Sequence, residues 1–251
     1  MPYADNQGIR IHYTVEGEGP PLVLQHGSTS SLQAWYQNGY VEPLKPHYQL
    51  ILVDARGHGA SGKPHEAGAY ALPLRVSDIV AVLDDLGIQQ AHYWGYSMGG
   101  WIGFGMAKHA ASRVQSLMIG GAHPYADSAE AFRGVDGTDP EAFIGALEKF
   151  SGIRATPEMR ERILGNDLQA LAAAMHDRDS LAEVIPTMTM PCFLYVGGDD
   201  PRLPKVETCV KDLPHATFVA LPSLNHAQAY MRSDLVLPHI AKFLHAVSKS
   251  A

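Results

Sequence analysis

The distribution of hydrophobic residues along the chain predicts a sheet that is covered on both faces. Near the amino terminus, Ile9, Ile11, Tyr13 and Val15 alternate with polar residues after a turn-forming stretch at 5–8, which predicts a half-exposed hairpin. Short, predominantly apolar runs then follow at residues 22–24, 50–53, 91–94, 114–119, 192–196 and 217–221. Such runs are typical of strands buried between two layers, so they predict a largely parallel central sheet.

Segments with helical spacing separate most of these runs. Residues 74–86 carry apolar side chains at helical intervals up to Gly87, and helices are also expected after residue 97 and over 235–247. Strands that alternate with helices form repeated βαβ units. The pattern therefore predicts an α/β fold in which helices flank the sheet.

Residues 122–185 break this alternation. They offer helical stretches, such as 140–150 and 168–175, but no convincing strand. A segment of about 60 residues is near the lower limit for an independently stable domain, so we expect a short helical cap inserted into one domain. The predicted core domain then comprises residues 1–121 and 186–251.

The composition narrows the class of partner. The chain has 251 residues, of which 46% are hydrophobic, and a formal net charge of -7 at pH 7. No basic field favours nucleic acid or an anionic membrane, and no apolar run reaches the roughly 18 residues of a membrane span. We therefore expect a small-molecule partner, with the oligomeric state left open. Residues 1–6 lack the basic and apolar regions of a signal peptide, which predicts a cytoplasmic protein.

The first candidate catalytic motif is Gly95-Tyr96-Ser97-Met98-Gly99, which lies where a predicted strand is followed by a helical stretch. Gly-x-Ser-x-Gly at such a junction is typical of a nucleophile elbow. A serine on this strained turn projects its hydroxyl from the sheet, and the flanking glycines remove β-carbons that would collide there. Ser97 is therefore the candidate nucleophile.

A serine nucleophile needs a histidine to take its proton and a carboxylate to orient that histidine. His226 follows the run at 217–221, whereas Asp199 and Asp200 follow the run at 192–196. These positions lie at the carboxyl ends of predicted strands, where open parallel sheets form their ligand sites. The sequence thus predicts a catalytic triad of Ser97, one of the two aspartates, and His226.

Taken together, these motifs resemble those of an α/β-hydrolase of the esterase type, over almost the whole chain outside the cap. Two further motifs support the resemblance, Gln-His-Gly-Ser at 25–28 and Asp-Ala-Arg-Gly-His-Gly-Ala-Ser at 54–61. The resemblance implies that the backbone N–H groups of Ser28 and Met98 form an oxyanion hole. It also implies a reaction that needs no metal or organic cofactor, and Cys192 and Cys209 give no metal-ligand spacing.

The same resemblance bears on the choice of aspartate and on the pocket. The family pattern Gly-x-x-Asp-Pro aligns Asp200, rather than Asp199, with the catalytic carboxylate. A residue that precedes proline is biased to an extended backbone, which would help to fix the carboxylate of Asp200. Many relatives carry a bulky apolar residue in place of Ser28, so the acyl pocket is expected to be roomier or more polar here.

Four residues are candidates for the substrate pocket. Tyr96 and Trp101 lie near the end of a predicted strand, and His123 and Tyr125 lie where the sheet gives way to the cap. Each has an alternative interpretation that the sequence leaves open. Core packing explains most aromatic residues without a ligand, and His123 and Tyr125 could equally form a hinge.

The predicted function is a serine hydrolase that cleaves carboxylic esters through an acyl-enzyme. The short cap favours small or medium acyl groups. Lactonases, thioesterases, carbon-carbon bond hydrolases and cofactor-free haloperoxidases or perhydrolases share the fold and remain alternatives. Ser97 argues against haloalkane dehalogenases and epoxide hydrolases, which use aspartate there. A ligand receptor that retains the triad without fast turnover is a remoter alternative from a different class.

Overall fold

The computed structural model of the protein describes residues 2–249 and is built on one eight-stranded sheet in the order β1-β2-β4-β3-β5-β6-β7-β8. The strands are β1 (Tyr3–Asn6), β2 (Ile9–Glu16), β3 (Pro21–Gln25), β4 (Gln49–Val53), β5 (Ala91–Tyr96), β6 (Val114–Gly120), β7 (Cys192–Gly197) and β8 (Ala216–Leu221). The pairs β1–β2 and β2–β4 are antiparallel, and all other neighbours are parallel. The prediction of a mostly parallel sheet is confirmed, and each apolar run lies within one strand.

The amino-terminal hairpin has a tighter turn than the stretch 5–8 suggested. Asn6 pairs with Ile9, so only Gln7 and Gly8 form the turn. Their φ angles are 55° and 84°, both positive. Two central residues with positive φ make a type I′ turn, whose twist matches that of the flanking strands.

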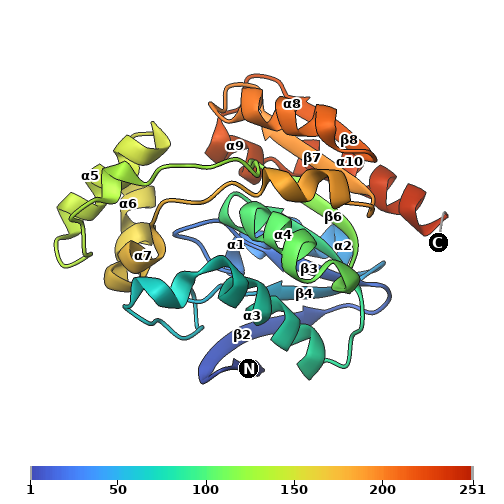
Figure 1. The fold of residues 1–251 in the computed structure, drawn as a ribbon, viewed down its shortest axis with the longest axis horizontal. Coiled ribbons are helices and arrows are strands. Elements are labelled where there is room, and N and C mark those ends of the chain that lie inside the picture. Colours follow the sequence, from blue (N-terminus) through green and yellow to red (C-terminus); the bar gives the residue numbers. More distant parts are fainter. Residues whose placement is uncertain (1, 250–251) are drawn as a thin grey trace.

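Helices cover both faces of the sheet (Figure 1). The α-helices are α1 (Gln33–Gln37), α2 (Val41–Leu44), α3 (Leu72–Asp85), α4 (Met98–His109), α5 (Pro140–Ser151), α6 (Pro157–Leu164), α7 (Leu168–Ala174), α8 (Leu203–Asp212), α9 (His226–Met231) and α10 (Ser233–Ser248). One core cluster contains residues of α3, α4 and α8, and a second contains residues of α1, α2, α9 and α10. Within residues 2–249, no helix has both the length and the apolar character that a bilayer span requires.

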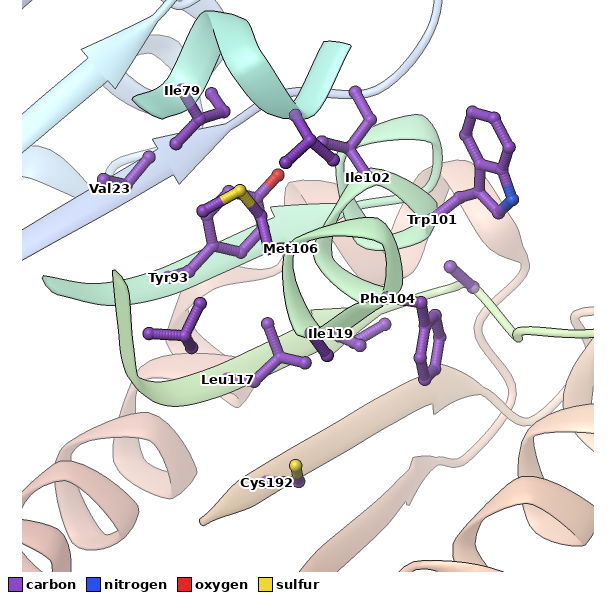
Figure 2. Close-up of a cluster of buried hydrophobic side chains, with 14 of the residues drawn as sticks. Val23, Ile79, Tyr93, Trp101, Ile102, Phe104, Met106, Leu117, Ile119 and Cys192 are labelled. Atoms are coloured by element: carbon purple, nitrogen blue, oxygen red, sulfur yellow. The ribbon is translucent and has the colours of Figure 1, made fainter. Parts of the chain in front are cut away.

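Alternate residues along each buried strand face these two layers. On β3, Val23 belongs to the first cluster, whereas Leu22 and Leu24 belong to the second. Figure 2 shows part of the first cluster, to which Ile79 of α3 and Tyr93 of β5 both contribute. Successive side chains in a strand point to opposite faces, so a strand covered on both faces carries apolar residues at most positions rather than at alternate ones. The apolar runs of the sequence have this origin.

A buried turn after β4 connects neighbouring loops to the helical layer through hydrogen bonds and an ion pair. The carboxylate of Asp54 accepts hydrogen bonds from the N–H groups of Leu32 at 2.8 Å and Ala60 at 2.9 Å. Two residues later, Arg56 forms a bidentate ion pair with Asp78 of α3, with both N–O distances at 2.6 Å. This ion pair is buried, so it links the turn to the helical layer in a low-dielectric environment.

The segment between β6 and β7 carries α5, α6 and α7, which lie together at the left of Figure 1 beside the sheet. They surround a third apolar cluster that includes Phe132, Phe143 and Ile163. The last part of the segment packs differently, because Leu181 and Val184 belong to the first core cluster. The division into a core domain and a cap at 122–185 stays a prediction, supported by this separate cluster.

Replacing Asp78 with alanine should destabilise the fold strongly, because it leaves the buried Arg56 charge unpaired. Breaking a buried pair by removing one partner costs about 3–5 kcal/mol. Asp84→Ala is the matched control on the same helix: Asp84 pairs with Arg113 at 2.7 Å, but its side chain is 61% exposed. An exposed pair contributes at most about 1 kcal/mol. Urea unfolding measures both variants, and equal losses would contradict the argument.

Candidate active site

Ser97 stands at the junction of β5 and α4 in a backbone conformation that side chains rarely adopt. Its φ angle is 53° and its ψ angle is -108°. The Ser97 N–H donates to the Gly120 carbonyl at 2.8 Å, and the first turn of α4 follows directly after Ser97 in the chain. A β-carbon at Gly95 would collide with the Gly99 carbonyl, and one at Gly99 would collide with the Gln25 carbonyl. The glycines of the motif are therefore required by the close approach of backbone segments.

Two hydrogen bonds connect Ser97 to the histidine and the aspartate. The Nε2 atom of His226 lies 2.9 Å from the Ser97 hydroxyl oxygen, and its Nδ1 atom lies 2.6 Å from Oδ2 of Asp200. A carboxylate only accepts, so Nδ1 carries the hydrogen and Nε2 is the acceptor for the serine hydroxyl. The structure thus brings these three residues together in one hydrogen-bonded chain.

Asp200, and not Asp199, faces the histidine. Asp200 is 2% exposed, and its other oxygen accepts from the Arg202 N–H at 3.0 Å and from the Arg202 guanidinium at 3.2 Å. Burial acts to raise the pKa of the Asp200 carboxyl, but the hydrogen bond and charge of His226, together with Arg202, outweigh it and lower that pKa. Asp199 is exposed, and its N–H donates to the Leu224 carbonyl. Asp200 is therefore available as an ionised partner for His226.

His226 is the first residue of α9, and two features fix it there. Asn225 caps the helix in a reciprocal capping box with Gln228, with both hydrogen bonds at 2.9 Å. The Tyr96 hydroxyl donates to the His226 carbonyl. Burial lowers the pKa of His226 below 6.5, partly opposed by the hydrogen bond to Asp200. The imidazole is therefore neutral at pH 7, as a proton acceptor must be.

Both residues assigned to the oxyanion hole lie close to Ser97, Met98 as the next residue of the chain and Ser28 as the residue after Gly27. Ser28 lines the cavity next to Gly27, on which a β-carbon would lie 3.3 Å from that of Ser97. His26 fixes this loop, because its Nδ1 donates to the Gly27 carbonyl at 2.7 Å while its Nε2 accepts from a backbone N–H of the turn after β4 at 3.1 Å. Met98 is the first residue of α4, where N–H groups have no acceptor within the helix. Its side chain is buried and does not line the cavity within residues 2–249.

Ser97 and His226 line a cavity of about 390 Å³. Helices α5 and α6 contribute an apolar wall to it, which includes Leu147, Phe150 and Ile163. A pocket of this size suits a small organic ligand, for which volumes of about 300–1,000 Å³ are usual.

Three of the four predicted pocket residues line this cavity, namely Tyr96, Trp101 and His123. Tyr96 and Trp101 also belong to the two core clusters, so the pocket and core interpretations apply together. Burial lowers the pKa of His123 to about 4. Tyr125 is not among the described residues that line the cavity; its ring packs on the first core cluster, 5.9 Å from the His123 ring.

Sequence reasoning missed several polar and aromatic residues of the cavity wall. Arg178 and Arg202 line it, as does Tyr230, whose ring stacks on Tyr96 at 4.4 Å. The position of Tyr230, one helical turn after His226, is a signal that could have found it. Arg178 lies in a polar stretch of the cap with no motif, so only the packing of the cap brings it to the site.

No group of three or more His, Cys, Asp or Glu side chains within residues 2–249 is arranged to hold a metal ion. Cys192 and Cys209 are free and buried in the first core cluster. Burial raises the pKa of both thiols to about 12. Their side chains therefore behave as small apolar residues.

Curated relatives align with this chain over different fractions of the two sequences. A pimeloyl-(acyl-carrier protein) methyl ester esterase from Vibrio vulnificus is 29% identical over 86% of this chain and 91% of that protein. A 3-oxoadipate enol-lactonase 2 from Acinetobacter baylyi is 28% identical over 78% of each. Other curated relatives, 32% to 35% identical, match over only 37% to 43% of their own length.

Solved structures and a family model complete the comparison. The enol-lactonase from Burkholderia xenovorans LB400 matches with a TM-score of 0.84 and 23% identity, covering 97% of this chain and 100% of that one. At this identity the match shows the fold alone. The family model for the alpha/beta hydrolase fold matches residues 20–162, which is more than half of the chain. On this match and this sheet, the chain belongs to the alpha/beta hydrolase fold family.

Proposed function

We propose that the protein is a serine hydrolase that cleaves carboxylic ester bonds of small or medium substrates through an acyl-enzyme. The hydrogen-bonded chain from Ser97 through His226 to Asp200 carries the proposal. A nucleophile, a base and a group that orients the base are the parts that acyl transfer requires. Their position on a cavity of about 390 Å³ supports a small-molecule substrate.

In the first half of the reaction, Ser97 attacks the ester carbonyl and its hydroxyl proton moves to Nε2 of His226. The tetrahedral intermediate then collapses, and the leaving alkoxide takes that proton and departs as the alcohol. In the second half, His226 takes a proton from water, which attacks the acyl-serine. The intermediate then collapses, the bond from the acyl carbon to the Ser97 oxygen breaks, and that oxygen takes the proton back from His226 as the acid leaves. Asp200 stays ionised and stabilises the imidazolium that forms twice.

The N–H groups of Ser28 and Met98 would stabilise the negative charge on the carbonyl oxygen. This charge develops only as the transition state is reached, so fixed donors lower the barrier without binding the ground state more tightly. Met98 lies at the amino-terminal end of α4, where the helix dipole also favours negative charge. The His26 bonds hold the other donor loop in place.

Lactone hydrolysis is the second candidate, because a lactone is a cyclic ester and meets the same machinery. The 3-oxoadipate enol-lactonase 2 relative, aligned over 78% of this chain, favours it over the thioesterase, carbon-carbon hydrolase and perhydrolase alternatives. In a lactone the leaving alcohol stays attached to the acyl group, so the acyl-enzyme would retain the whole substrate.

Replacing Ser97 with alanine should lower kcat for p-nitrophenyl acetate by about 10⁴- to 10⁶-fold, because no other group attacks the carbonyl. The protein should still fold, because the substitution removes only the hydroxyl group and no packing contact is lost. Ser112→Ala, at an exposed position, is the control and should match the wild-type enzyme. Retention of most activity in Ser97→Ala, with an unchanged circular dichroism spectrum, would refute the proposed nucleophile.

The adjacent aspartates provide a matched pair of variants. Asp200→Asn should lower kcat by about 10⁴-fold, because the amide no longer holds the imidazole in the required tautomer. Asp199→Asn changes an exposed side chain and should alter kcat by no more than about twofold. The proposal fails if the two variants lose activity equally or if Asp199→Asn is the more damaged.

The pH dependence should report the titration of His226. Its pKa lies below 6.5 because burial disfavours the imidazolium, so the neutral base persists into mildly acidic solution. For a neutral ester, kcat/KM should rise with pH through a midpoint below 6.5 and then level off. A flat profile, or a midpoint above 6.5, would contradict this assignment.

A further inference from the structure

The cavity is locally positive within a chain that is negative as a whole. Three arginines line it, Arg162, Arg178 and Arg202, whereas Asp127 is the one acidic residue of its wall within residues 2–249. The formal net charge of the chain is -7. A positively charged cavity in a negatively charged protein favours ligands that carry anionic groups.

Two of these arginines do not have an unpaired charge inside the cavity, because one is paired with a carboxylate and the other is exposed to solvent. The guanidinium of Arg202 lies 3.2 Å from Asp200 and so belongs to the hydrogen-bonded chain of the site. Arg162 is exposed on α6. Of the three, only Arg178 is half-buried and makes no side-chain hydrogen bond or ion pair with another residue of the described chain; the Asp127 carboxylate acts on its charge only from a greater distance.

The backbone fixes Arg178 to the base of the cap. Its N–H donates to the Asp127 carbonyl at 2.8 Å and its carbonyl accepts from the Asp127 N–H at 3.1 Å. The Asp127 carboxylate makes its ion pair elsewhere, with Lys205 at 3.9 Å. The guanidinium of Arg178 lies over the ring of Trp101, 4.7 Å from its centroid. Trp101 in turn lies one helical turn after Ser97, about 6 Å along the axis of α4.

The positive charge of Arg178 thus lies in the reaction cavity without an ion pair to any residue of the described chain. Burial lowers the pKa of Arg178 to about 10, opposed by the nearby charge of Asp127, so the guanidinium is still protonated at pH 7. A charge that is partly removed from water is costly unless it is paired. The Trp101 ring provides some compensation and also holds the planar group in one orientation.

We propose that Arg178 binds a carboxylate of the substrate, remote from the reacting carbonyl, and thereby makes an ester or lactone of a dicarboxylic or hydroxy acid the preferred substrate class. The proposal rests on the function proposed above. One guanidinium offers two parallel N–H donors that match the two oxygens of a carboxylate. A phosphate dianion would bring more charge next to Asp127, so a monoanion fits better.

Matched esters test the preference. Monomethyl glutarate carries the carboxylate in its acyl part and carboxymethyl acetate carries it in its alcohol part, and the neutral dimethyl glutarate and methoxycarbonylmethyl acetate are their respective controls. Arg178→Gln should lower kcat/KM for at least one anionic ester by about ten- to a hundredfold and change the neutral esters by less than about threefold. The anionic ester that is affected identifies which side of the scissile bond faces Arg178.

Two further variants separate local charge from general effects. Arg154→Gln removes an exposed arginine of the cap that is not part of the cavity wall, so it changes the net charge equally and should leave the preference intact. Arg178→Lys keeps the charge but loses the planar fork, and should retain part of the preference. If Arg178→Gln does not fold, Arg178→Lys takes its place: a reduced preference supports the guanidinium site, and a preference equal to that of the wild-type enzyme would overturn it.

Binding to the Ser97→Ala variant separates this proposal from the proposed function. Calorimetry should give at least tenfold tighter binding of one anionic ester than of its neutral control, and Arg178→Gln in the same background should abolish the difference. Equal binding of the matched esters, or a difference that persists without Arg178, would overturn the carboxylate site. Intact binding preference without turnover by the wild-type enzyme would instead overturn the hydrolase function.

Discussion

The strained backbone at Ser97 is the constraint on which the rest of the site depends. A non-glycine residue with a φ of 53° costs about 1–3 kcal/mol and persists only where its surroundings enforce it. Here β5 is fully buried on one side of Ser97 and most of α4 is buried on the other, so relaxing the turn would disturb both. The strain leaves the hydroxyl at the end of the central strand, where the other loops can reach it.

The remaining groups are held to one another as well as to the scaffold. The loops that follow β7 and β8 are joined by hydrogen bonds from Gly198 to Leu221 at 2.7 Å and from Asp199 to Leu224 at 3.0 Å. The aspartate and histidine on these loops therefore cannot move apart independently. Tyr96 adds a bond from the elbow itself to the His226 carbonyl. Such preorganisation matters because misplacing a reacting group by about 1 Å can cost a hundredfold in rate.

The sequence and the structure agree where local pattern and motif determine position. The strands follow from apolar runs, and Ser97, Asp200 and His226 follow from motifs at the carboxyl ends of strands. The strand order is not readable in this way, because the inner strands are mostly apolar on both faces and the pattern does not identify the neighbour of each strand. Arg178 is equally hidden: its polar stretch is typical of a solvated loop, and its place over Trp101 depends on how the cap packs. Residues brought together by packing alone leave no local signal.

The charges of the cavity also act on the base. Burial is the main cause that lowers the pKa of His226, and the positive charges of Arg202 and Arg178 lower it further. A carboxylate bound at Arg178 would offset part of that positive charge and raise the pKa of the imidazole in the complex. A base with a higher pKa takes the serine proton more readily, provided that it is still neutral at the working pH. The arrangement thus keeps His226 neutral in the free enzyme, while an anionic substrate would strengthen it as a base on binding.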